Sequence, residues 1–145
     1  MKKIVLLFAI LGFTGLTYAN DPLNNTLWKT VDESTKQAKA LVKFTEQKNG
    51  TLTATIQSVL TPGEQEVCTK CKGTYHNKSL KNLTIINNLT PVGNADYDNG
   101  TILDPSSGKT YSLKAHLAEN GKTLELRGFV GFSLLGRTQV WQRVN

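Results

Sequence analysis

The stretch Thr110–Gly128, TYSLKAHLAENGKTLELRG, determines how the rest of the chain is interpreted. Apolar and polar residues alternate along Tyr111–Leu117, and the alternation resumes along Thr123–Leu126 after an Asn120-Gly121 pair. A period of two places the apolar side chains on one face of a β-strand. The Asn-Gly pair tolerates the positive φ angles of a tight hairpin turn. The stretch therefore predicts two antiparallel strands that share one apolar face.

The same pattern occurs in the first half of the chain, where two alternating segments flank Asn49-Gly50. Turn residues also separate the remaining alternating segments, and no segment shows the sustained apolar stripe of a helix. We therefore expect about eight strands, over Leu27–Val31, Lys39–Glu46, Thr51–Val59, Leu83–Leu89, Thr101–Asp104, Lys109–Leu117, Thr123–Val130 and Arg137–Val144.

Consecutive hairpins with one apolar face have to enclose that face. A small up-and-down β-barrel does so and also removes exposed strand edges. The predicted fold class is therefore all-β, a small antiparallel barrel of the lipocalin or calycin type, with a two-sheet sandwich as the alternative. One long connection, Leu60–Asn82, lacks the alternation, and we expect it to lie over an open barrel end.

The first residues predict export. Lys2 and Lys3 precede a short apolar run, and small residues near Ala19 suit a cleavage site. Residues 1–19 are therefore interpreted as a secretory signal peptide and residues 20–145 as a single β-barrel domain. The predicted location is the bacterial periplasm or the outside of the cell, with no stable membrane anchor.

The charge of the chain argues against nucleic acid as a partner. Of the 17 basic residues, two lie in the signal peptide, so 15 remain against 11 acidic ones, a net charge of +4. These residues are scattered, whereas nucleic-acid binding needs a concentrated basic patch. The sequence does not indicate a protein partner.

Four motifs, taken together, resemble one family. They are LWKTVDESTKQAKALVKF (27–44), VCTKCKG (67–73), GTILDPSSGKTYSLKAHL (100–117) and LELRGFVGFSLLGRTQVWQRV (124–144). In these residues the chain is similar to the secreted bacterial family known as domain of unknown function 2147, over essentially its whole mature length. The resemblance implies a lipocalin-like barrel and leaves the activity open.

The resemblance also implies how one barrel end is closed. Lipocalins and their relatives pack a tryptophan of the first strand against an arginine of the last strand. Trp28 fits the tryptophan, Arg137 or Arg143 fits the arginine, and Trp141 belongs to the same closing motif. Thr26 stands where lipocalins usually carry glycine.

The two cysteines, Cys68 and Cys71, have three interpretations. A zinc site would need four ligands, and only His76 and His116 could complete the set. A thiol oxidoreductase would need a helix N-terminus in a βαβ setting, although nearby lysines could favour a thiolate. Because exported proteins meet an oxidising environment, a Cys68–Cys71 disulfide that shapes the long loop is preferred.

The function that these features favour is binding of a small, largely apolar molecule inside the barrel. An anionic amphiphile would also suit the lysines of the long loop, Lys70, Lys72, Lys78 and Lys81, which outnumber Glu64 and Glu66. The alternatives are a redox protein acting through its cysteines and a filled barrel acting as a surface interaction module. The predicted ligand-binding residues are Val42, Phe44, Leu52, Ala54, Ile56, Tyr111, Leu113, Leu124 and Leu126.

No motif indicates an enzyme, a cofactor or a metal. GFSLLG places two residues between Ser133 and Gly136, one more than a hydrolase nucleophile elbow allows. SSGKT lacks the leading glycine of a phosphate-binding loop, because Leu103 stands in that position. Asp96 and Asp98 are interpreted as turn residues of a Gly/Asn-rich loop.

Overall fold

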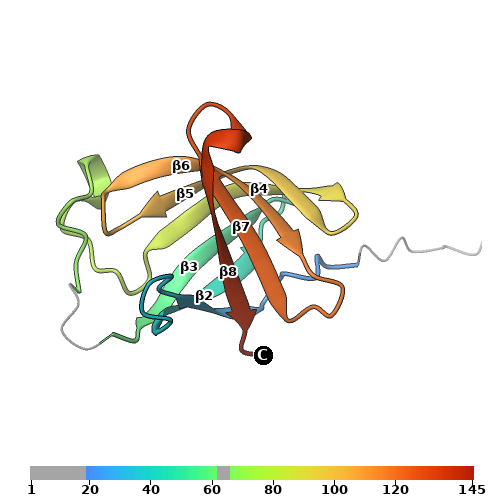
Figure 1. Ribbon diagram of the computed structural model, residues 1–145, viewed down its shortest axis with the longest axis horizontal. Coiled ribbons are helices and arrows are strands. Elements are labelled where there is room, and N and C mark those ends of the chain that lie inside the picture. The colour runs from blue at the N-terminus through green and yellow to red at the C-terminus, as the bar shows by residue number, and fades with distance from the viewer. Residues whose placement is uncertain (1–18, 62–65) are drawn as a thin grey trace, which may run out of the picture.

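Eight antiparallel strands form a closed barrel in the computed structural model, which describes residues 19–61 and 66–145 (Figure 1). Each strand pairs with the next, and the first strand pairs with the last. The predicted all-β up-and-down barrel is confirmed, and the two-sheet sandwich is excluded. The elements are β1 (Leu27–Val31), β2 (Ala38–Glu46), β3 (Leu52–Val59), η1 (Gly73–Tyr75), β4 (Thr84–Gly93), β5 (Asp96–Asp104), β6 (Lys109–Leu117), β7 (Thr123–Phe129), η2 (Ser133–Leu135) and β8 (Gly136–Arg143).

The hairpin of Thr110–Gly128 forms as its alternation predicts. Leu117 of β6 pairs with Leu124 of β7, and both side chains are buried. The turn between them contains Gly121 at a φ of 68°, a conformation that glycine adopts without steric cost.

The β4–β5 hairpin is longer than the sequence predicts. The two strands continue to Gly93 and from Asp96, so that only Asn94 and Ala95 remain between them, both with positive φ. The register shifts in β4 and β5 interrupt the period-two pattern by which strands are recognised. The interpretation of Asp96 and Asp98 as loop residues is therefore wrong, because both lie on β5.

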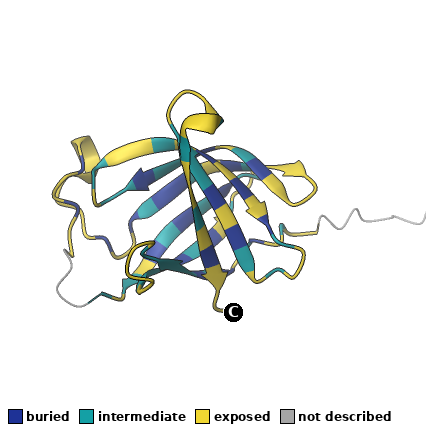
Figure 2. Cartoon of the chain, viewed as in Figure 1, coloured by how far each residue is buried: buried dark blue, intermediate teal, exposed yellow. Residues whose placement is uncertain are grey.

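One end of the barrel is filled. The strands turn their large apolar side chains inward there, and Figure 2 shows buried residues alternating with less buried ones along strands such as β6 and β7. The side chains that fill this closed end are completely buried, and the largest of them are Trp28, Phe44, Leu52, Leu89 and Leu124. This layer is the hydrophobic core of the protein.

The segment before β1 plugs the closed end. Leu23 is completely buried, and the backbone N–H of Asp21 donates a hydrogen bond to the Glu46 carboxylate (3.0 Å). The Tyr97 hydroxyl donates a hydrogen bond to Oδ1 of Asp21 (3.0 Å). Asp21 thus fastens the plug to β2 and β5.

The predicted signal peptide, residues 1–19, lies outside the described residues except for Ala19. Among the residues that are described, no helix has the length and apolar character needed to cross a membrane.

Candidate functional site

The opposite end of the barrel contains a cavity of about 920 Å³. Four connections contribute residues to its mouth: 32–37 between β1 and β2, the described residues 66–83 between β3 and β4, 105–108 between β5 and β6, and 130–135 between β7 and β8. The barrel is therefore hollow at this open end.

The cavity exists because inward side chains become smaller toward the open end. Along β2 they run from Phe44 to Val42 to Ala40, and along β7 from Leu126 to Gly128. A β-carbon added to Gly128 would lie 3.6 Å from Cβ of Tyr111, which is an ordinary contact. The barrel radius is set by strand number and tilt, so small side chains leave space that the backbone cannot close.

Trp141 forms the floor of the cavity. Its ring lies 6.3 Å from that of Phe44 at an interplanar angle of 53°, a tilted arrangement that aromatic pairs favour. The indole N–H donates a hydrogen bond to Oε1 of Gln139 (3.3 Å), which also lines the cavity.

The chemistry of the wall changes with depth. The deeper part is mostly apolar, and polar or charged groups gather at the mouth. The apolar wall consists of Ala40, Val42, Ile56, Ile85, Ile102, Leu113, Leu126 and Trp141. The charged residues at the mouth are Asp32, Glu33, Lys39, Lys70, Asp104 and Arg137.

An ion pair at the rim of the mouth joins β8 to the β1–β2 loop. Nη2 of Arg137 lies 2.9 Å from Oε2 of Glu33, and Nε donates to the same oxygen at 3.0 Å. The hydrogen bond and the charge of Glu33 raise the pKa of Arg137 further above its ordinary value. In the same loop, hydrogen bonds from the Ser34 hydroxyl and from the N–H groups of Thr35 and Ser34 lower the pKa of Asp32.

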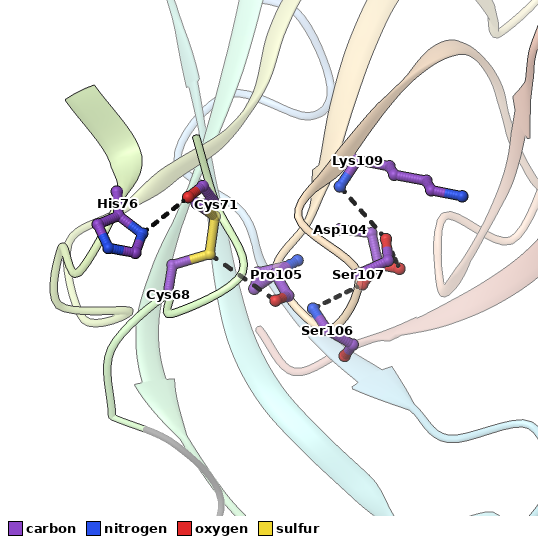
Figure 3. Close-up of a disulfide and its surroundings, with 8 residues drawn as sticks. All are labelled: Cys68, Cys71, His76, Asp104, Pro105, Ser106, Ser107 and Lys109. Carbon is purple, nitrogen blue, oxygen red and sulfur yellow. Dashed lines mark hydrogen bonds between the residues drawn. A yellow bond between two sulfur atoms is a disulfide. The ribbon is translucent and has the colours of Figure 1, made fainter. Parts of the chain in front are cut away.

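The Cys68–Cys71 disulfide forms, as preferred, and lies in the long loop at the mouth (Figure 3). Cys68 is 1% and Cys71 is 3% exposed. Sγ of Cys68 lies 3.7 Å from the carbonyl oxygen of Pro105, and the His76 ring donates through Nδ1 to the Cys71 carbonyl (3.0 Å). A redox site needs an accessible sulfur, so this burial counts against the thiol oxidoreductase alternative.

The disulfide loop is joined to the β5–β6 turn by a close backbone contact. A β-carbon added to Gly108, whose φ is 72°, would come within 1.9 Å of the Lys70 carbonyl oxygen. Lys70 lies between the two cysteines and lines the cavity together with Val67 and Leu80 of the same loop. The long loop therefore forms one wall of the mouth.

The predicted ligand-binding residues fall into two groups. Val42, Ile56, Tyr111, Leu113 and Leu126 line the cavity. Phe44, Leu52, Ala54 and Leu124 are buried without lining it, because they lie nearer the closed end, where the barrel is filled. Among the four lysines of the long loop, the structure places only Lys70 at the cavity, and Glu64 lies outside the described residues.

The residues expected to close the barrel lie at both ends. Trp28 pairs with Arg143 in the β1–β8 ladder, and paired residues have side chains on the same face. Nη1 of Arg143 donates to the Gly121 carbonyl at 3.4 Å. Arg137 lies at the open end instead, since five residues of β8 separate it from Arg143.

Trp28 is completely buried, and its indole N–H donates a hydrogen bond to Oγ1 of Thr26 (2.7 Å). Thr26 in turn donates its hydroxyl proton to the Leu23 carbonyl (2.5 Å). Thr26, which stands where lipocalins usually carry glycine, thus accepts the hydrogen bond of the buried Trp28 indole N–H.

Several cavity residues were not predicted from the sequence. Ile85 lies opposite a register shift that hides its inward orientation, and Ile102 pairs with the cavity residue Tyr111. Gln139 faces the cavity although it is polar, and a pattern that places apolar residues inside and polar residues outside assigns it to solvent. Its spacing of two from the buried Trp141 is the signal that could have identified it, because such residues of a strand share one face.

The described residues contain no group of three or more His, Cys, Asp or Glu side chains able to hold a metal ion. The two histidines of the zinc hypothesis lie in different places. His76 contacts the disulfide loop, while Nδ1 of His116 lies 2.6 Å from Oδ1 of Asp96 on the outside of β5 and β6.

Comparisons with known proteins agree with this architecture. Residues 26–143 match the model of a family described as "Uncharacterized protein conserved in bacteria (DUF2147)". Protein HP1028 from the human pathogen Helicobacter pylori, described as belonging to the lipocalin family, has a similar structure with a TM-score of 0.73. The two chains are 23% identical, over 85% of this chain and 83% of that chain. The search of curated proteins gave no match.

Proposed function

The chain belongs to the DUF2147 family, and we propose that it is an exported, non-enzymatic carrier of a small amphiphile. The apolar part of the ligand occupies the barrel cavity, and its anionic head lies at the mouth. The observation that carries the proposal is the cavity of about 920 Å³ with an apolar wall and charged rim. Cavities that bind small molecules commonly have volumes of about 300–1,000 Å³.

Burial of the apolar part provides the driving force. Each CH₂ group that leaves water contributes about 0.8 kcal/mol. The wall groups Ile56, Ile102 and Leu126 offer apolar surface to such a chain. A ligand with a polar end would keep that end at the mouth, where water remains accessible.

Lys70 is the residue that we assign to the anionic head. Arg137 is paired with Glu33, and Lys39 lies 4.0 Å from Asp32. Among the described residues, Lys70 forms no ion pair and lines the cavity. The disulfide between its two flanking cysteines and the contact with Gly108 restrict the backbone of Lys70, so less backbone freedom remains to be lost on binding.

Displacement of a fluorescent fatty acid tests this function. We expect saturable binding of one molecule per chain. A long-chain carboxylate should displace the fluorescent fatty acid more strongly than the alcohol of equal chain length does. Lys70→Gln should reduce this preference for the carboxylate, whereas Lys72→Gln, a neighbouring lysine away from the cavity wall, should leave it unchanged. Absence of saturable binding would contradict the carrier function, and equal effects of both substitutions would contradict the role of Lys70.

A further inference from the structure

The β7–β8 connection exposes a contiguous group of apolar side chains beside the cavity mouth. Val130 is 68%, Phe132 75%, Leu134 89% and Leu135 77% exposed. We call these four residues the apolar tip; they lie in the exposed loop that projects beyond the strands at the top of Figure 2. Single exposed apolar residues are common on proteins, but a contiguous patch marks a surface that contacts something.

The tip is held in its exposed position by Arg127 of β7. Its Nε donates to the Ser133 carbonyl (2.5 Å), its Nη2 to the Leu134 carbonyl (3.2 Å), and its Nη1 to Oγ1 of Thr138 (2.9 Å). These bonds fix η2 against the strands on both sides. The loop backbone is therefore held in an ordered conformation, in which the four apolar side chains remain largely exposed.

The tip itself carries no acidic residue. From Leu126 to Gly136 the sequence contains Arg127 and no Asp or Glu. The nearest acid of the mouth, Glu33, is already paired with Arg137. An apolar tip with Arg127 at its base, on a domain with a net charge of +4 over residues 20–145, is complementary to an anionic lipid surface, which accepts the apolar groups below its headgroups and attracts the positively charged protein.

The area of the tip is too small for a stable protein interface. If each of its four side chains buried about 100 Å², the contact would reach about 400 Å², below the roughly 800 Å² per partner of a standard protein interface. The barrel is closed, so it offers no free strand edge by which a partner could extend this contact. A membrane needs no such area, because a few inserted side chains suffice for reversible docking.

We propose that the apolar tip docks reversibly onto an anionic membrane surface. Val130 and Leu135 also line the cavity, so docking would place the cavity mouth against the lipid. A ligand could then pass between bilayer and barrel with little exposure of its apolar part to water. The docking itself does not depend on the proposed ligand, and the two can be tested separately.

Co-sedimentation with vesicles tests the docking. The vesicles consist of phosphatidylcholine alone or of phosphatidylcholine mixed with phosphatidylglycerol. We compare the protein with a Phe132→Ser/Leu134→Ser variant, which leaves the cavity wall intact. The matched control is Val92→Ser/Val140→Ser, two side chains that are 57% and 50% exposed elsewhere on the barrel.

The protein should bind the mixed vesicles, and added salt should weaken this binding. The tip variant should bind at least about tenfold more weakly, while the control variant binds as the unchanged protein does. Displacement of the fluorescent fatty acid without vesicles should be the same for all three, which shows that the cavity is unaffected. No vesicle binding, an equal loss in both variants, or a tip-dependent dimer in light scattering would overturn the proposal.

Discussion

Gly108 and Lys70 are in backbone contact, although 37 residues separate them in the chain and neither lies on a strand. A β-carbon on Gly108 would lie 1.9 Å from the carbonyl oxygen of Lys70 and 2.4 Å from its carbonyl carbon. The β5–β6 turn is therefore the surface on which the disulfide loop rests (Figure 3). Because the opposing atoms belong to the backbone, a larger residue at position 108 has to move one of the two segments.

Gly108→Ala should separate the disulfide loop from the turn. The positive φ of 72° alone makes alanine unfavourable here, at a cost of about 1–3 kcal/mol. Gly50→Ala is the matched control, since Gly50 has a φ of 81° and no atom within 4 Å of an added β-carbon. We expect urea denaturation to show the larger loss for Gly108→Ala, together with faster amide exchange in residues 66–83. Equal losses without any change in exchange would mean that the contact is unimportant.

Removal of the disulfide should affect binding more than folding. The ring closed by Cys68 and Cys71 is short, so its contribution to the free energy of unfolding is only about 2 kcal/mol by chain entropy. The double variant Cys68→Ala/Cys71→Ala should therefore remain folded by circular dichroism. It should bind fatty acid more weakly, because Lys70 is no longer held at the mouth. Full retention of affinity would contradict the positioning role that we assign to the disulfide.

Thr26 should be required for the burial of Trp28. Thr26→Val leaves the buried indole N–H without its acceptor, which costs about 1–3 kcal/mol. Thr26→Ser keeps the hydroxyl and should cost much less. Thermal unfolding of the two variants gives the comparison, and an equally stable valine variant would show that another group accepts the indole proton.

Tyr97 should make the protein sensitive to alkaline pH. Burial, and then the charge and hydrogen bond of Asp21, raise the pKa of Tyr97 above its ordinary value near 10. The folded state thus favours the protonated phenol. Its contribution is complete below about pH 10, the unfolded pKa, and is lost as the pH rises from there toward the folded pKa. Tyr97→Phe should be less stable at neutral pH by about 1 kcal/mol and should show a smaller decline above pH 10 than the unchanged protein. If the stability of both proteins declines equally above pH 10, groups other than Tyr97 cause the decline.

The fold could be predicted from the sequence because its signals are local. The alternation along Lys109–Leu117 and the turn at Asn120-Gly121 specify a hairpin without any knowledge of distant residues. The β4–β5 hairpin is longer than predicted, because the sequence signal there is not local. Left-handed residues such as Asn88 and Asn99 interrupt its period, and only pairing with neighbouring strands shows that it continues.

The site could be predicted only in part, because an inward residue lines the cavity only if it lies near the open end of the barrel. Alternation identifies Leu124 and Leu126 equally as inward residues, yet only Leu126 reaches the cavity. Whether a given inward position is filled or open depends on side chains from the other strands at the same level. Contacts such as that between Gly108 and Lys70 join segments with no common pattern and leave no signal in the sequence.

The central claim is that the cavity holds the ligand, and the most direct test is to fill the cavity with a larger side chain. Gly128 tolerates a β-carbon at ordinary contact distances, so Gly128→Leu should project into the cavity without disturbing the barrel. Val140→Leu on the outside of β8 is the control, since Val140 is 50% exposed. The dissociation constant for a fluorescent fatty acid should rise at least about tenfold for Gly128→Leu and stay unchanged for Val140→Leu, with both variants folded. An unchanged dissociation constant for a folded Gly128→Leu protein would contradict the account.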